Sequence, residues 1–286
     1  MTLEELRAGL RSSAAKVHSP DESDAIARIY LEDKFGIKRA SPLTESQSEL
    51  PSDRMDEITR DLELLSQGVP VQYITGIQWF GGHIYKVNKN VLIPRPETEE
   101  LVELISNELK LMKMPLILLD VGTGSGCIPV TLKLKFPMIT AIATDISAGA
   151  LEVARFNAQN LNAEVTFVED DILSPLYVPN QKFDFIVSNP PYIPYSEAEQ
   201  MDHHVVGFEP HTALFAPDKN PLIYYSAVLN YSLSHLKPGG FLYFEIHQIM
   251  GRDVVKLPEM NQFADVQILK DMSGNARFIK AVLKKS

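Results

Sequence analysis

The stretch Asp120-Val121-Gly122-Thr123-Gly124-Ser125-Gly126 decides the fold of this 286-residue chain. It follows an apolar run, residues 116–120, that is typical of a buried strand, and it precedes a helical pattern over residues 127–135. Its glycines let the backbone turn tightly and let a ligand lie against it. The spacing is GxGxG and not the GxGxxG of dinucleotide binding, so the start of the helix can face a carboxylate. The stretch predicts a ligand-binding turn between strand and helix, although such turns also serve packing alone.

After this stretch, apolar strand-like runs alternate with helical patterns. Such alternation implies an α/β fold, a mostly parallel sheet with helices on both faces. The last two strands have no long helix between them, which predicts a closing antiparallel hairpin. The expected strands are residues 116–120, 139–145, 165–168, 183–187, 241–246, 264–269 and 278–283, and the expected helices are residues 127–135, 147–161 (capped by Ser147) and 222–236 (ended by Lys237-Pro238-Gly239-Gly240).

The part of the chain before this region has a different pattern. Residues 3–17 have helical periodicity, and Ser19-Pro20 begins a second helix that runs to Phe35 before Gly36. Ser41-Pro42 predicts a turn, and a further helix ends before Gly68. Residues 78–87 indicate a β-hairpin with a glycine turn. We therefore predict a helical N-terminal domain over residues 1–70, a β-hairpin linker over 71–95 and a ligand-binding domain over 96–286.

The composition is that of an ordinary globular protein, with 45% apolar and 22% charged residues. No apolar run approaches the roughly 20 residues that span a bilayer. The acidic, amphipathic N-terminus has the features of neither a secretory signal nor a transit peptide. The single cysteine, Cys127, excludes an internal disulfide. These features lead us to expect a cytoplasmic protein without a membrane partner.

The net charge of −10 bears on the class of partner. Stable nucleic-acid binding usually needs a basic surface that displaces counterions from phosphates. Lysine and arginine are scattered in this chain, apart from the tail Lys284-Lys285. The charge therefore favours a small molecule or a protein partner and disfavours direct nucleic-acid binding, without excluding one basic patch.

Acidic residues follow the second and third expected strands. Asp145 ends the second strand, where a carboxylate can accept hydrogen bonds from both hydroxyls of a ribose. The alternative is an acid that only caps the helix beginning at Ser147. Asp171 and Ile172 follow the third strand, where a carboxylate could accept from an adenine amino group and an apolar side chain could pack on the purine. Acids in such a turn are more often merely solvated.

The fourth strand ends in Asn189-Pro190-Pro191-Tyr192. Proline has no N–H and a fixed φ, so the residue before it is extended and the two prolines form a stiff shelf. The backbone carbonyls of this shelf have no partner in a sheet and need another donor. An asparagine amide, a free carbonyl and a ring face together suit a flat NH2 group. The alternative is an ordinary turn at the end of a strand.

In this order, the glycine turn, Asp145, the 169–172 acids and the Asn-Pro-Pro-Tyr motif resemble the class I S-adenosylmethionine-dependent methyltransferases. Three further stretches, PVQYITG at 70–76, IPRPETE at 93–99 and FEPHTAL at 208–214, are similar to those of the peptide chain release factor N5-glutamine methyltransferases. The similarity runs from about residue 70 to the C-terminus, and the N-terminal bundle matches only in kind. It implies a seven-stranded, mostly parallel sheet with S-adenosyl-L-methionine as cofactor.

The resemblance also implies the substrate, the glutamine of the Gly-Gly-Gln motif in class I release factors. In that reading Asn189 and the Pro190 carbonyl accept the two amide N–H bonds, and Tyr192 stacks on the amide plane. The catalytic candidates are thus Asn189, Pro190 and Tyr192. The candidates for binding the cofactor are Asp120, Gly122, Thr123, Gly124, Ser125, Gly126, Asp145, Asp171, Ile172 and Asn189, and those for binding the substrate are Asn189, Pro190, Pro191, Tyr192, Arg95 and Glu97.

Other features are assigned lesser roles. The segment 193–220 reads as a long loop, which is commonly functional, and we expect a substrate lid there. The histidines lack partners at metal-ligand spacing, so no metal is expected. His247 stands where the family has glycine, which puts any family role of that strand end in doubt. We expect a monomer.

Two alternatives remain open at this point. The first is an adenine-N6 or cytosine-N4 amino-methyltransferase, because those bases present the same planar NH2 group; the charge and the stretches at 93–99 and 208–214 disfavour it. The second is a non-catalytic cofactor-binding module of the translation machinery. Asn189 and Tyr192 disfavour this second reading, because a pure binder has no need of them.

Overall fold

The computed structural model describes residues 1–37, 50–113 and 115–285, so the expected turn at Ser41-Pro42 lies outside the described residues. The chain divides into two compact units. One comprises Met1–Ile77 together with Asp202–Phe208, and the other comprises Gln78–Met201 and the chain from Glu209 onward.

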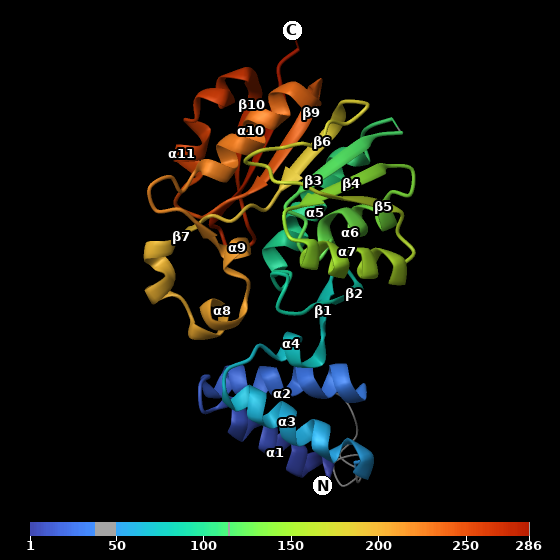
Figure 1. The fold of residues 1–286 in the computed structure, drawn as a ribbon, viewed down its shortest axis with the longest axis vertical. Helices are drawn as coiled ribbons and strands as arrows, with labels where there is room; N and C mark the ends of the chain where they lie inside the picture. Colours follow the sequence, from blue (N-terminus) through green and yellow to red (C-terminus); the bar gives the residue numbers. More distant parts are fainter. Residues whose placement is uncertain (38–49, 114, 286) are drawn as a thin grey trace. The chain divides into compact units, whose positions relative to one another are not determined.

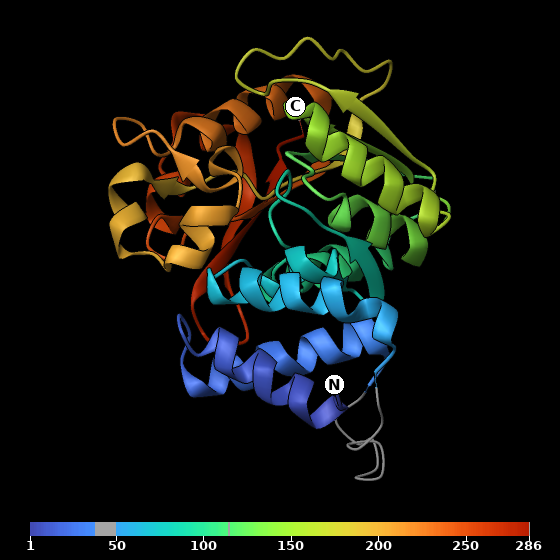
Figure 2. The same cartoon turned by 60° about the horizontal axis from the view of Figure 1, so that its bottom comes forward.

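The first unit is helical, and its long helices are blue and light blue in Figure 2. Capping boxes at Thr2 and Ser19 begin the first two helices, and Gly36 ends the second in the left-handed region, with φ of +69°. The described helices are α1 (Leu3–Ala14), α2 (Pro20–Phe35), α3 (Met55–Ser66), the short α4 (Val71–Thr75) and α8 (His203–Phe208). The apolar faces of α1 to α4 pack into one core that includes Leu6, Leu10, Tyr30, Ile58 and Leu65.

The second unit is built on a seven-stranded sheet, in the order β10-β11-β9-β6-β3-β4-β5 (Figure 1). The strands are β3 (Ile117–Val121), β4 (Thr140–Asp145), β5 (Val165–Glu169), β6 (Phe183–Ser188), β9 (Leu236–Glu245), β10 (Phe263–Lys270) and β11 (Ala276–Leu283). Pairing is parallel from β9 through β5, whereas β11 is antiparallel to both β9 and β10. The mostly parallel α/β sheet with its antiparallel closing hairpin is therefore confirmed.

Both faces of this sheet are buried. Leu118 and Phe185 belong to one apolar cluster, while their chain neighbours Leu119 and Ile186 belong to a second. Because successive side chains of a strand point to opposite faces, these clusters are the two layers of core. The first lies under α5 (Pro96–Leu109), α6 (Cys127–Lys135) and α7 (Ala148–Asn160), and the second under α10 (Ile223–His235) and α11 (Gly251–Val255). The buried strands read as continuous apolar runs for this reason.

The expected β-hairpin is present as β1 (Ile77–Phe80) and β2 (His83–Lys86). The buried Asn157 of α7 forms two hydrogen bonds with the end of β2 and a third with the glycine turn. Its Oδ1 accepts from the Lys86 amide at 2.7 Å, and its Nδ2 donates to the Lys86 carbonyl at 3.0 Å and to the Ser125 carbonyl at 2.9 Å. One side chain thus joins the hairpin, helix α7 and the glycine turn.

The prediction of a long loop over residues 193–220 is wrong. The segment contains β7 (Ile193–Pro194), a 3-10 helix η3 (Tyr195–Gln200), α8, α9 (His211–Leu214) and β8 (Phe215–Ala216), and β7 pairs with β8. Elements of two to six residues are too short to show a period in sequence, which is why they read as loop.

Some predicted boundaries also need correction. Lys237-Pro238-Gly239-Gly240 is part of β9, which begins directly after α10 ends at His235. Helix α1 ends at Ala14, three residues before the expected end at Val17. Helix α4 was not predicted, because it is only five residues long.

We predict that Asn157→Ala lowers the free energy of unfolding by about 3 kcal/mol or more, since three hydrogen bonds of a buried amide are lost and their partners are left unsatisfied. Urea unfolding measures this change. The exposed Asn160→Ala at the end of the same helix is the control and should change stability by less than about 0.5 kcal/mol. If both substitutions lower the free energy of unfolding by the same amount, the three hydrogen bonds of Asn157 do not stabilise the fold.

Candidate active site

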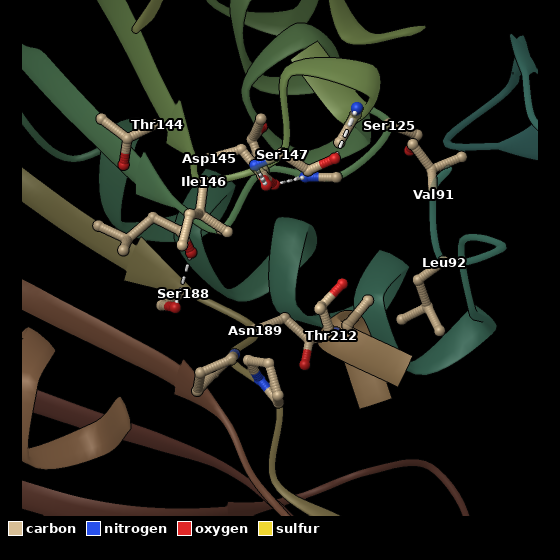
Figure 3. Close-up of a pocket in the computed structure, with 18 of the residues that line it drawn as sticks. Val91, Leu92, Ser125, Thr144, Asp145, Ile146, Ser147, Ser188, Asn189 and Thr212 are labelled. Carbon is tan, nitrogen blue, oxygen red and sulfur yellow. Dashed lines mark hydrogen bonds between the residues drawn. The ribbon is translucent and has the colours of Figure 1, made fainter. Parts of the chain in front are cut away.

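A pocket opens at the carboxyl ends of the central parallel strands (Figure 3). The turn after β3 contributes Gly122–Ser125, the end of β4 contributes Asp145, and Ser188 and Asn189 come from the end of β6. Neighbouring parallel strands end at the same edge of a sheet, where α/β proteins bind their ligands. The alternation of strands and helices is thus what brings these distant residues to one place.

Most of the residues predicted from sequence line this pocket. Those that do are Arg95, Gly122, Thr123, Gly124, Ser125, Asp145, Asp171, Ile172, Asn189, Pro190 and Pro191. The residues not found among its lining are Glu97, Asp120, Gly126 and Tyr192. The individual roles assigned to all of these residues stay predictions.

Sequence reasoning missed several parts of the lining. One wall consists of Val91 and Leu92, which follow the β-hairpin, and another consists of Thr212 and Ala213 of α9 (Figure 3). No residue pattern marks Val91 and Leu92 as a wall, and Thr212 and Ala213 lie in the 208–214 stretch, whose residues were given no individual site role from the sequence. Cys127 is buried and also lines the pocket.

Asp145 organises the edge of the pocket next to the glycine turn. Its Oδ2 accepts from the Gly124 amide at 2.8 Å, and its Oδ1 accepts from the Ser147 amide at 2.9 Å. Burial raises the pKa of this carboxyl, and the amide hydrogen bonds oppose that rise. The expected Ser147 cap is present, since its hydroxyl accepts from the Ala150 amide. Next to Asp145, the apolar side chain of Ile146 is exposed at the pocket.

Asp120 lies fully buried at the start of the glycine turn. Within the described part of the chain, neither of its carboxylate oxygens has a hydrogen-bond partner, and the same holds for the buried Thr123 hydroxyl. Burial raises the pKa of Asp120 to about 7; the nearby Thr123 hydroxyl lowers it somewhat and Asp145 raises it further. A buried carboxylate without donors is costly, so this end of the site suits a cationic group.

Asn189 enters the pocket from the end of β6. The preceding Ser188 donates its hydroxyl to the Val121 carbonyl at 2.7 Å, which fixes the strand end against β3. The Asn189 Nδ2 lies 3.5 Å from the Thr98 hydroxyl oxygen. The stiff prolines follow at once, and both line the pocket.

Tyr192 packs away from the pocket, against the apolar cluster under α10. Its ring contacts that of His247, with centroids 5.9 Å apart. Burial raises the pKa of the Tyr192 phenol, and burial lowers the pKa of His247, whose Nε2 lies 3.5 Å from a Glu197 oxygen. The histidine at the usual glycine position is therefore accommodated by a contact with Tyr192.

Arg95 forms an ion pair with Glu209, which is almost fully buried. The other oxygen of Glu209 accepts from the Ile93 amide at 3.0 Å. This carboxylate thus joins the segment before α5 to the segment before α9, and both segments supply walls of the pocket. The ion pair occupies part of the guanidinium that we predicted to bind substrate.

In the described ranges, no cluster of three or more histidine, cysteine, aspartate or glutamate side chains could hold a metal ion. None of the helices among the described residues has the length and apolar character needed to cross a membrane.

Comparison with known proteins identifies the family. Residues 98–206 match the Methyltransferase small domain family, and residues 8–76 match the PrmC N-terminal domain family. A release factor glutamine methyltransferase of Bacteroides thetaiotaomicron is 38% identical over 276 residues, covering 96% of this chain and 98% of that protein. One of the same name from Enterococcus faecalis is 41% identical, covering 90% and 91% of the two chains. This chain belongs to the release factor glutamine methyltransferase family.

Solved structures show the same fold in other methyltransferases. A methyltransferase from Pyrococcus furiosus has a TM-score of 0.51 with 19% identity and covers 82% of this chain and 100% of its own. The Thermus thermophilus 16S rRNA N2 G1207 methyltransferase, in complex with AdoMet and guanosine, has a TM-score of 0.53 with 16% identity and covers 73% and 50%. The class I methyltransferase fold and the family resemblance expected from sequence are both confirmed. The similarity also extends to residues 8–76, beyond the start at about residue 70 that the sequence analysis gave it.

The raised pKa of Asp120 predicts how the folding stability of this methyltransferase depends on pH. Its carboxyl is protonated up to about pH 7 in the folded chain but only to about pH 4 when unfolded. The folded state therefore binds the extra proton in this window, and stability falls as pH rises from about 4 to 7. Asp120→Asn should remove that loss, so the ligand-free variant should be more stable than wild type by on the order of a few kcal/mol at pH 8 and by much less at pH 5.

Urea unfolding at several pH values measures this difference. The exposed Asp253→Asn is the matched control and should change stability little at any pH. If the difference in the free energy of unfolding between Asp120→Asn and wild type does not grow with pH, the pKa of Asp120 is not raised in the folded chain.

Proposed function

We propose that this chain transfers a methyl group from S-adenosyl-L-methionine to the side-chain amide nitrogen, N5, of the glutamine in the Gly-Gly-Gln motif of class I peptide chain release factors. The observation that carries the proposal is the position of Asn189. Its side chain lies on the same pocket as the glycine turn and Asp145. A planar NH2 group at Asn189 and a methyl donor on the glycine turn can therefore meet.

The residues of the pocket fit S-adenosyl-L-methionine. Asp145 keeps acceptor capacity beyond its two backbone bonds and can accept from ribose hydroxyls. The exposed apolar Ile146 and the pocket residues Asp171 and Ile172 suit the adenine ring and its amino group. The buried, unpartnered oxygens of Asp120 favour the cationic end of the methionine moiety. When bound, the cofactor supplies an electrophilic methyl group on a positively charged sulfur.

The chain's own contribution is to position the amide. An amide nitrogen is a weak nucleophile because its lone pair is delocalised into the carbonyl. Asn189 Oδ1 and the Pro190 carbonyl accept the two N–H bonds and thereby aim the nitrogen at the methyl group. Orientation of this kind supplies several kcal/mol, up to roughly 7–11 in ideal cases. The nitrogen gains the methyl group and releases one proton to solvent, and S-adenosyl-L-homocysteine is the second product.

We assign a role to each of the three segments predicted from the sequence. Residues 1–70 dock the release factor, residues 71–95 form the linker, and residues 96–286 bind the cofactor and perform the transfer. The net charge of −10 suits a protein partner better than a nucleic acid. We place the reaction in the cytoplasm, where release factors act, and expect the enzyme to work as a monomer.

An adenine-N6 or cytosine-N4 methyltransferase is the nearest alternative, since the shelf at Asn189 would accept those bases as well. The acidic charge argues against it. A non-catalytic module would bind the cofactor without needing Asn189. Methyl transfer to a release factor, compared with transfer to duplex DNA, distinguishes these two alternatives from the proposed function.

We predict that Asn189→Ala lowers kcat about 100-fold or more and leaves the affinity for S-adenosyl-L-methionine within about 3-fold, because the acceptor for the substrate amide is lost while all the other residues predicted to bind the cofactor remain. Labelled methyl transfer to a release factor and calorimetric binding of the cofactor measure the two quantities. The exposed Asn160→Ala is the control. Unchanged turnover of Asn189→Ala would remove the basis of the proposed function.

The substrate is tested by offering wild-type enzyme a release factor, the same factor with its motif glutamine changed to alanine, and duplex DNA. We expect label on the first alone. Label on the DNA, or equal label on both factors, would overturn the assignment. No label on any of them, with the cofactor bound, would support the non-catalytic alternative.

A further inference from the structure

A buried hydrogen-bond chain joins Asn189 to Thr98, which also lines the pocket, and to Glu245. Thr98, in the first turn of α5, is 3% exposed, and its hydroxyl donates to Glu245 Oε2 at 2.7 Å. Glu245 is the last residue of β9 and is 2% exposed. The Asn189 Nδ2 in turn lies 3.5 Å from the Thr98 oxygen.

The strand register explains why these groups meet. Strand β9 pairs in parallel with β6, with Phe244 opposite Ser188. The next residues along the two strands are Glu245, the last residue of β9, and Asn189, so both lie at the same level of the sheet. Helix α5 packs across this edge and inserts Thr98 between them.

The donors and acceptors of these hydrogen bonds can be arranged in only one way while Glu245 is ionised. An ionised carboxylate can only accept hydrogen bonds, so the single proton of the Thr98 hydroxyl is used on Glu245. The Thr98 oxygen can then only accept, and it accepts from the NH2 end of the Asn189 amide. The carbonyl end of that amide is left to face the pocket.

We propose that Thr98 and Glu245 are positioning residues that fix which end of the Asn189 amide meets the substrate. This inference rests on the proposed function, in which Asn189 Oδ1 accepts an N–H of the substrate amide. The reversed rotamer would place an NH2 group against the NH2 group of the substrate and could not orient it. Without the chain the two rotamers would have similar energies, because the two ends of an asparagine amide have nearly the same shape.

The charged and polar groups around Glu245 determine whether its carboxyl is ionised. Burial raises the pKa of Glu245 to about 7, and the negative charge of Glu97 adds to that rise. The side-chain hydrogen bonds with Thr98 and Asn189 and the positive charge of Arg277 lower the pKa. The Tyr225 hydroxyl donates to the Glu245 carbonyl, and His247 and Tyr192 lie beside the same strand end. A protonated Glu245 can donate to Thr98, and the chain then loses its fixed direction.

The test compares Thr98→Val, which removes the hydroxyl at nearly constant volume, with Thr98→Ser, which keeps it. Thr98→Val should lower kcat for release factor methylation 10- to 100-fold, with the affinity for S-adenosyl-L-methionine and the KM for the release factor changed less than 3-fold. Thr98→Ser should recover most of the loss. The advantage of wild type over Thr98→Val should shrink as the pH falls below about 7.

A matched control removes a buried threonine hydroxyl elsewhere in the same unit. Thr131 of α6 is fully buried, and its hydroxyl forms a 2.7 Å hydrogen bond with the Tyr85 hydroxyl. Thr131→Val should lower stability much as Thr98→Val does while leaving kcat unchanged. Equal losses of kcat in the two valine variants, or no loss in Thr98→Val, would overturn the proposal.

A second readout needs no substrate. The side-chain amide resonances of Asn189, identified by their loss in Asn189→Ala, should shift in Thr98→Val and stay near their wild-type positions in Thr98→Ser. Unmoved resonances in Thr98→Val would contradict the positioning role. Should wild-type enzyme fail to methylate a release factor, the proposed function fails, and the resonances still decide whether Thr98 holds Asn189.

Discussion

The site depends on the parallel pairing of three strands. In the register of the sheet, Val121 of β3 lies opposite both Thr144 of β4 and Ser188 of β6. The residues that follow these three are Gly122, Asp145 and Asn189, so the glycine turn, the acid and the amide lie at one level along this edge of the sheet. A parallel sheet buried on both faces permits few other registers, because a slip by one residue would exchange the two core layers.

Polar contacts from outside the sheet then hold the walls of the pocket. Asn157 joins the glycine turn to the β-hairpin, Glu209 joins the segments before α5 and α9, and Thr98 joins Asn189 to Glu245. Each is a buried or nearly buried polar side chain whose partners lie far away in the sequence. Groups of this kind cost free energy unless they are satisfied, which is why they enforce a single arrangement.

The sequence predicted what local patterns determine. Apolar runs and caps placed the sheet strands and most helices, and the ends of those strands supplied the glycine turn, Asp145 and Asn189. The short elements between residues 193 and 220 were missed because they are too short to show a period. The contact between Thr98 and Glu245 spans 147 positions, and no local pattern encodes it. Its partners become visible only when the register of β6 and β9 is known.

The central claim is that Asn189 presents its carbonyl oxygen to the amide of a glutamine substrate. A crystal structure of the enzyme with S-adenosyl-L-homocysteine and a Gly-Gly-Gln peptide tests it most directly. We expect the glutamine amide nitrogen to lie within hydrogen-bond distance of Asn189 Oδ1 and the Pro190 carbonyl oxygen. Asn189 Nδ2 should still donate to the Thr98 hydroxyl oxygen. A glutamine bound elsewhere, or an Asn189 amide with its nitrogen turned to the substrate, would contradict it.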